Sequence, residues 1–376
     1  MKKRNWIPVL VLVAVCAALA LAPGVGTVAE DGGLNCRARV TATDETQVQL
    51  TGLLEYGTQR LEVELLDGPG KGKRFRAENE IRAQLELDKK FAVGDIASVI
   101  WPEDGADDRT TLVARDYWRF GWTLTLFGAF AVLLIAFGGA TGAKALFSFV
   151  FSCLAVWKML VPLCLRGWEA GWTSFAVVSV LTAVIMYLVA GATKKGAVAF
   201  LGAMLGISVS LVLARIVTAV MHVNGATMPY VQSLLYSGYA ELDLADIFNG
   251  AIILASSGAV MDLAMDISAG IVEVHRHNPA LGRTELFLSG IRMGRAVVGT
   301  MTTTLLLAYS GGYLTLLMVF AAQGTPPAVF LNSSLVSAEL VKTLVGSFGL
   351  VLVAPFTALV GALTFGKTSS NLPAVE

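Results

Sequence analysis

The fold of this chain is decided by the stretch GWTLTLFGAFAVLLIAFGG at residues 121–139, in which no side chain is charged. A run of about 20 apolar residues has the length that crosses the hydrocarbon core of a bilayer as a helix. The whole chain of 376 residues has a similar character, because 55% of it is hydrophobic and only 15% is charged. A soluble chain of this length carries more charge on its surface. The sequence therefore predicts a membrane protein.

Further apolar blocks extend this to an all-α polytopic membrane protein with about eight transmembrane helices. Three basic residues at 2–4 precede an apolar run at 6–22, which is either a cleaved signal peptide or a retained anchor. We favour the anchor, because Pro23 directly follows one candidate cleavage site. Seven more spans are expected near 121–139, 145–164, 172–191, 197–221, 247–270, 296–321 and 340–365.

The segment between the anchor and these spans has a different pattern. Apolar and polar residues alternate at residues 61–65 (LEVEL), which is typical of a half-buried strand. Several such short strands predict a small β-rich domain, either a sandwich or a barrel of the OB type. The predicted domains are an anchor at 1–23, a β-rich domain at 24–117, a seven-helix membrane domain at 118–366 and a tail at 367–376.

The distribution of Lys and Arg predicts the orientation, because the cytoplasmic loops of membrane proteins carry an excess of both. With the N-terminus inside, the short outer loops contain only Arg166. Both termini are then cytoplasmic, and residues 24–117 are extracytoplasmic. The predicted inner segments carry Lys2, Lys3, Arg4, Lys144, Lys194, Lys195, Arg276, Arg283, Arg292, Arg295 and Lys367.

Two aspartates stand within the predicted span 247–270, where a charged side chain is costly and usually faces a cavity or a partner. Asp262 and Asp266 are four residues apart, so they lie on one face of the helix. Asn249 precedes them in the same span and is a further candidate for this polar face.

The next span begins with a second group of polar residues. Arg292 and Arg295 lie near its cytoplasmic end, and Thr300 and Thr303 follow about 6–13 Å deeper, level with the aspartates. The pattern predicts a cytoplasm-accessible site for a cation or a coupled proton, with the threonines as ligands and the arginines as gating or pairing groups. The alternative is a buried ion-pair network that only fixes helix packing.

Three other charged residues in the spans have simpler interpretations. Arg215 either neutralises an aspartate or extends its side chain to the membrane surface. Glu339 and Lys342 are three residues apart, so we expect them to pair with each other.

Other classes of function lack support in the sequence. The formal net charge is zero, which argues against nucleic acid as a partner. The sequence shows no Ser-His-Asp set, zinc motif or phosphate-binding glycine loop, so we expect no enzymatic activity and no cofactor. The expected partners are the lipid bilayer and a small solute or ion. A homo-oligomer is compatible with these features, and the identity of any bound metal stays open.

Two motifs resemble the YibE/YibF-type membrane proteins over roughly residues 118–365. The first is GAVMDLAMDI at 258–267, and the second is SGIRMGR at 289–295, which runs into GTMTTTL at 299–305. The resemblance implies a bacterial multipass membrane protein of the kind often described as a transporter or efflux component. It also implies an N-terminal anchor and an extracytoplasmic β-rich segment. The family usually has asparagine at the position of Thr303.

These observations lead to one main hypothesis and one alternative. The main hypothesis is a transporter or permease, coupled to a cation or to protons, whose site lies between the sixth and seventh spans. The alternative is a membrane scaffold or sensor whose extracytoplasmic β-domain binds a partner or ligand.

Overall fold

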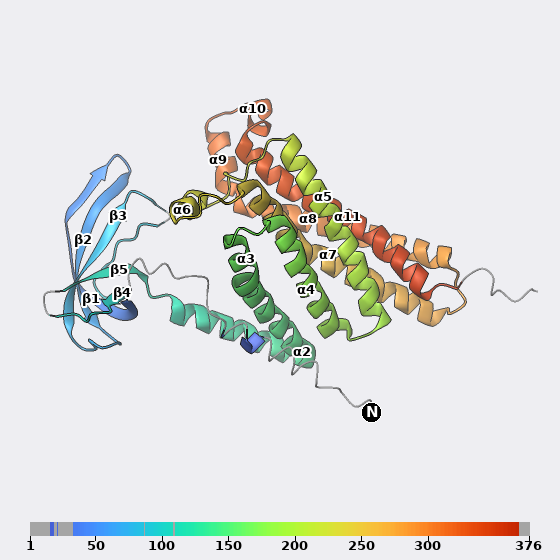
Figure 1. The fold of residues 1–376 in the computed structure, drawn as a ribbon, viewed down its shortest axis with the longest axis horizontal. Coiled ribbons are helices and arrows are strands. Elements are labelled where there is room, and N and C mark those ends of the chain that lie inside the picture. The colour runs from blue at the N-terminus through green and yellow to red at the C-terminus, as the bar shows by residue number, and fades with distance from the viewer. Residues whose placement is uncertain (1–15, 19–20, 22–32, 86, 108–109, 368–376) are drawn as a thin grey trace, which may run out of the picture. The chain divides into compact units, whose positions relative to one another are not determined.

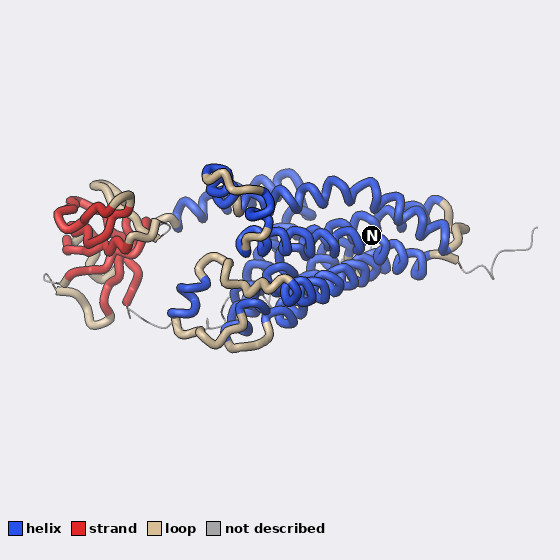
Figure 2. Tube along the Cα trace, turned by 90° about the horizontal axis from the view of Figure 1, so that it is seen from above, coloured by secondary structure: helices blue, strands red, loops and turns tan. Residues whose placement is uncertain are grey.

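The computed structural model describes residues 16–18, 21, 33–85, 87–107 and 110–367, which form two compact units (Figure 1). The first unit spans Gly26–Leu134, and the second combines Met1–Val25 with Ile135–Glu376. Nearly all of the predicted anchor at 1–23 and of the predicted tail at 367–376 lies outside the described residues. The strands are gathered in the first unit, and long helices run side by side in the second (Figure 2).

The first unit contains a closed barrel of five strands. The order around the barrel is β1–β2–β3–β5–β4, and all neighbours are antiparallel except β3 and β5. This arrangement confirms the predicted β-rich part in its barrel form, the class to which OB folds belong. The strands are β1 (Gly33–Thr51), β2 (Leu54–Leu65), β3 (Arg74–Arg82), β4 (Ile96–Pro102) and β5 (Thr111–Tyr117).

The barrel interior follows from the alternation in the sequence. Alternate side chains of β3 are buried, and the register pairs Val63 of β2 with Phe75 of β3. Trp101 of β4 meets Phe75 edge to face, with ring centroids 5.4 Å apart. Large side chains from three strands thus fill one apolar core.

Two polar side chains are also buried in the barrel. Gln59 of β2 donates to the Phe91 carbonyl at 2.8 Å and accepts from the Phe91 N–H at 3.0 Å. Asn79 of β3 donates to Gln59 Oε1 at 3.1 Å and to the Lys89 carbonyl at 2.6 Å. The pair therefore satisfies backbone groups of the loop at 89–91, which has no strand partner to do so.

From residue 120 onward the chain is helical, and several helices are long and apolar enough to cross a membrane. Five stretches meet this condition, namely Phe120–Leu165, Ala170–Ala190, Lys194–Val220, Leu244–His277 and Ser334–Phe365. The elements are α2 (Phe120–Ala155), a π-helical turn η1 (Val156–Leu160), α3 (Val161–Leu165), α4 (Ala170–Ala190), α5 (Lys194–Val220), α6 (Val231–Tyr236), α7 (Leu244–His277), α8 (Arg283–Gly312), α9 (Leu314–Ala322), α10 (Pro327–Leu331) and α11 (Ser334–Phe365).

The predicted helical membrane part is confirmed, but the count of eight spans is not established. The predicted spans 121–139 and 145–164 lie in one stretch of 46 residues, Phe120–Leu165. Gly139 breaks this stretch, because its φ of 53° and ψ of −128° are not helical. The predicted span 296–321 falls on α8 and α9, which are bent by 67° at their junction. The described residues therefore contain five candidate spans, or six when the bent pair counts as one.

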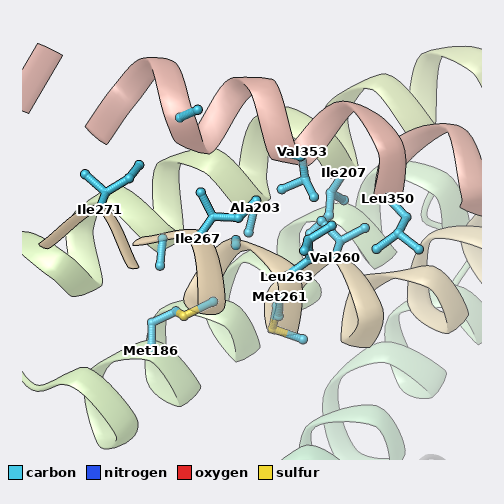
Figure 3. Packing of buried hydrophobic residues seen from close by; sticks show 14 of the residues in the cluster. Met186, Ala203, Ile207, Val260, Met261, Leu263, Ile267, Ile271, Leu350 and Val353 are labelled. Carbon is cyan, nitrogen blue, oxygen red and sulfur yellow. The ribbon is translucent and has the colours of Figure 1, made fainter. Parts of the chain in front are cut away.

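α7 has neighbours on several sides in the second unit. α4, α5, α8 and α11 all pack against it. Figure 3 shows Val260 of α7 together with Ile207 of α5 and Val353 of α11 in the apolar core. α5 and α11 also approach each other closely, because a Cβ on Gly202 would collide with Thr357 Oγ1. This packing fixes α7 as the helix around which polar residues must be placed.

Candidate functional site

A cavity of about 810 Å³ lies at the N-terminal end of α7. Its walls come from the end of α3, the loop before α4, the end of α5 and the start of α7. Segments far apart in the sequence therefore meet at one site. The charged and hydrogen-bonding residues in the lining include Glu169, Arg215, Thr218, His222, Asn224, Glu241, Asp243, Asp246 and Asn249.

Arg215 of α5 connects two sides of this cavity. Its Nη2 atom lies 2.8 Å from Glu169 Oε2 and 3.2 Å from Asp246 Oδ1. Its guanidinium carbon also lies 5.3 Å from the ring centroid of Trp172. Asp246 is buried, whereas the Glu169 side chain is 68% exposed. The contact with Asp246 is therefore the one that solvent and salt screen least.

The backbone of α4 completes the surroundings of Asp246. The Gly171 N–H donates to Asp246 Oδ2 at 3.0 Å. A Cβ on Gly171 would lie 2.8 Å from Asp246 Oδ1, so this close approach requires glycine. Asp246 also stands in the first turn of α7, where the helix dipole favours a negative charge. The Arg215 guanidinium, the Gly171 N–H and the N-terminus of α7 thus all direct positive charge toward this side chain.

Further polar groups extend the site on both sides of Asp246. Deeper along α7, the buried Asn249 accepts a hydrogen bond from Thr218 Oγ1 of α5 at 2.8 Å. At the start of the helix, Asp243 caps α7 by accepting from the N–H groups of Ala245 and Asp246. The lining contains four carboxylates and one guanidinium. Such a lining attracts cations.

The structure divides the site that the sequence predicts. Asn249 lines the cavity at the N-terminal end of α7. Asp262 and Asp266 follow later in the same helix, about 20 Å and 26 Å further along its axis at roughly 1.5 Å per residue. Asn249 therefore does not share a binding site with the two aspartates.

Asp262 and Asp266 lie on the exposed face of α7. The neighbouring residues Val260, Leu263 and Ile267 are buried in the core. Within the part of the chain that the structure describes, neither aspartate forms an ion pair. The two carboxylates are thus open to a partner from outside the described helices.

The predicted residues of α8 are exposed as well. Thr300 and Thr303 each donate their hydroxyl to a backbone carbonyl one turn earlier, at 2.8 and 3.0 Å. Their oxygen lone pairs remain free to accept, as a ligand would need. Arg292 and Arg295 are exposed on the same helix, and neither forms an ion pair within the described residues.

Sequence reasoning found some charge pairs and left others open. The predicted pair of Glu339 and Lys342 is confirmed, with Nζ and Oε1 2.5 Å apart. Arg215 had two interpretations, and it forms an ion pair. Asp246 was missed, because its partner lies 31 residues away and only the fold brings them together. The only sequence feature that could have indicated Asp246 is its position at the start of an apolar block.

A second cavity, of about 510 Å³, lies on the barrel across β1, β2 and β3. The register places Arg60 between Asp44 and Glu78, and it pairs Glu62 with Arg76. These five residues line the cavity. Opposite charges across neighbouring strands stabilise the sheet, so the arrangement has a structural use as well. Among the described residues of the whole chain, no cluster of three or more His, Cys, Asp and Glu could hold a metal ion.

Fold and site together define a polytopic helical membrane protein with a small β-barrel domain. Residues 126–367 match the model of the YibE/F-like protein family, and this match covers more than half of the chain. The chain therefore belongs to that family, which confirms the resemblance in its motifs. The matched part includes the cavity and both exposed aspartates, but not the barrel. No match is found among curated proteins or among solved structures.

Proposed function

We propose that this protein is a transporter or permease of the bacterial inner membrane that moves a small cation, or couples to protons, along α7. One observation carries the proposal, namely the acidic cavity of about 810 Å³ at the N-terminal end of that helix. Two further carboxylates, Asp262 and Asp266, stand nearer the other end of the same helix. α7 therefore presents acidic oxygen atoms near both of its ends.

In this proposal the Arg215 guanidinium occupies the cation site while no substrate ion is bound. It occupies the space between Glu169 and Asp246, where an incoming cation would find oxygen ligands. Such a cation competes with the guanidinium for Asp246. A proton on Asp246 has a similar effect, because it removes the charge that holds Arg215. Entry of an ion or a proton is thereby coupled to movement of α5 against α7.

The middle of α7 separates its two ends. Ser256 and Ser257 are buried and donate to carbonyls of their own helix, at 2.9 and 2.8 Å. Ile253 and Val260 lie in the apolar core. An ion cannot pass this packed region without movement of the surrounding helices, which agrees with transport by alternating access.

We further propose eight spans, with both termini in the cytoplasm and the barrel at 24–117 outside. The excess of Lys and Arg in the inner segments supports this orientation. Cys16 supports a retained anchor, because it is buried in one cluster with Phe151 of α2 and Val177 of α4. The cavity then opens to the outside, and Asp262 lies nearer the cytoplasm.

Flux measurements on purified protein in liposomes test the transport proposal. Under an ion or proton gradient, Asp262→Asn and Asp246→Asn are expected to slow the flux by about tenfold or more. The control is Asp104→Asn, which alters an exposed loop of the barrel unit and should leave the flux unchanged. The proposal is wrong if no cation or proton flux is found, or if Asp262→Asn keeps the wild-type rate.

The cavity on the barrel favours a second candidate, a scaffold or sensor whose barrel binds an extracytoplasmic partner or ligand. Arg60 and Arg76 are exposed there and offer donors to an acidic group. Deletion of residues 36–113 would then abolish function, while Asp262→Asn would be tolerated. The transporter predicts the opposite pattern, so the two variants separate the candidates.

A further inference from the structure

The exposed faces of α7 and α8 carry charges and glycines in matching order. On each helix, three exposed residues follow one another at intervals of four, which places them on one face. They are Gly258, Asp262 and Asp266 on α7, and Arg295, Gly299 and Thr303 on α8.

The packing of the two helices shows which residues share a depth. Near the cytoplasm-proximal end of α7, a Cβ on Gly294 of α8 would lie 3.4 Å from Ile267 Cδ1 of α7. Further along, a Cβ on Gly346 of α11 would lie 3.1 Å from Ser256 of α7 and 3.5 Å from Leu305 of α8. Both contacts fit one antiparallel register. In that register Asp266 is level with Arg295, Asp262 with Gly299, and Gly258 with Thr303.

The contacts among the described residues do not explain these two faces. Asp266 and Arg295 are exposed and form no ion pair within the described residues, although lipid is a costly surrounding for both charges. A Cβ on Gly258 or Gly299 would meet no atom of the described residues within 4 Å. By contrast, a Cβ on Gly294 would lie 2.7 Å from Ala354 Cβ. Small residues without such contacts suit the approach of another helix.

We infer that this face of α7 and α8 is the interface between two copies of the chain. In a two-fold dimer whose axis runs along the membrane normal, residues at one depth meet residues of the partner at the same depth. α7 of each copy faces α8 of the other, so Asp266 meets Arg295 of the partner subunit, and the same contact forms in reverse. The glycines let the helices approach. Charge complementarity selects a second copy over lipid as the occupant.

The inference shares one assumption with the proposed function, namely that α7 and α8 cross a bilayer. Its test measures association and not flux, so either idea can fail alone. A dimer without transport would refute the transporter, and transport by a monomer would refute the interface.

Charge reversal in the full-length protein tests the interface. The wild type in lipid nanodiscs is expected at twice the chain mass of 39.7 kDa by native mass spectrometry. Asp266→Arg and Arg295→Asp, each alone, oppose like charges and should weaken association by about tenfold or more. When the two variants carry different tags and are produced together, opposite charges face each other again. The mixed dimer is therefore expected to co-purify.

Controls keep this test decisive. Glu103→Arg reverses an exposed charge in the barrel unit and should leave the dimer intact. Where a reversal prevents folding, oxidative crosslinking of Asp266→Cys in one copy to Arg295→Cys in another, in a background without the native cysteines, is expected to give a covalent dimer. A monomeric wild type, a dimer that survives Asp266→Arg, the absence of the crosslink, or two variants that stay apart when mixed would each overturn the inference.

Discussion

The two ends of α7 hold their carboxylates in opposite ways. Asp246 is buried, lies 3.2 Å from the Arg215 guanidinium and accepts the Gly171 N–H at 3.0 Å. Asp262 is exposed and has no ion-pair partner within the described residues. A charge whose partners all lie in its own chain supports the fold, and its loss damages stability. A charge without them is available to an ion, a proton or a second subunit.

The largest difference in stability is expected between two variants that each lose a guanidinium, Arg215→Met and Arg295→Met. Arg215→Met leaves Asp246 buried without its cation, so we expect the free energy of unfolding to fall by about 2 kcal/mol. The loss stays below that of a fully buried pair, because the Arg215 side chain is 38% exposed. Arg295→Met removes no ion pair that the described residues form, so it should lower the stability of the monomer less. Denaturant titration in micelles measures both, and equal losses would contradict the comparison.

Glycine substitutions should give a smaller difference. A Cβ at position 171 would lie 2.8 Å from Asp246 Oδ1, so Gly171→Ala is expected to displace this carboxylate at a cost of about 1–2 kcal/mol. Gly128→Ala in α2 is the matched control, because no atom of the described residues lies within 4 Å of the added Cβ. Thermal unfolding in detergent should show a lower midpoint for Gly171→Ala alone. A loss in the control of the same size would refute the argument from close approach.

Neutralising Asp246 or Asp262 should change the stability less than the substitution of Gly171 does. Asp246→Asn weakens the contact with Arg215, whereas Asp262→Asn removes a charge that has no ion-pair partner in the described chain. We expect Asp262→Asn to change the free energy of unfolding by less than about 0.5 kcal/mol. The same denaturant titration applies. A large loss for Asp262→Asn would show that its charge is structural.

The barrel contains a buried titratable group that is uncharged at neutral pH, the Cys36 thiol. Burial, and next the nearby charge of Asp67, raise the pKa of the Cys36 thiol above its usual range. The folded state then binds this proton more tightly than the unfolded state does. The resulting stability is present below the ordinary thiol pKa of about 8.5 and is lost as the pH rises above it. Unfolding at pH 7.5 and 9.5, compared between wild type and Cys36→Ala, should show a smaller pH effect in the variant.

Local patterns predict most of the fold but only part of the site. Alternation at residues 61–65 is enough for a barrel strand, and apolar runs are enough for the long helices. The same runs end one predicted span at residue 139, where Gly139 interrupts the helix, but they do not reveal that the helical stretch continues from Phe120 to Leu165. The four-residue spacing of Asp262 and Asp266 predicts their shared face. Whether that face is covered depends on neighbours from distant segments, as does the pairing of Arg215 with Asp246.

The most direct test of the account is whether the two ends of α7 are open to opposite sides of the membrane. In a cysteine-free background, His222→Cys reports on the cavity and Glu273→Cys, at an exposed position, reports on the other end of the helix. A membrane-impermeant thiol reagent should label the first only from outside and the second only from the cytoplasmic side. Labelling of both from one side, or no labelling at Glu273→Cys from either side, would contradict the account.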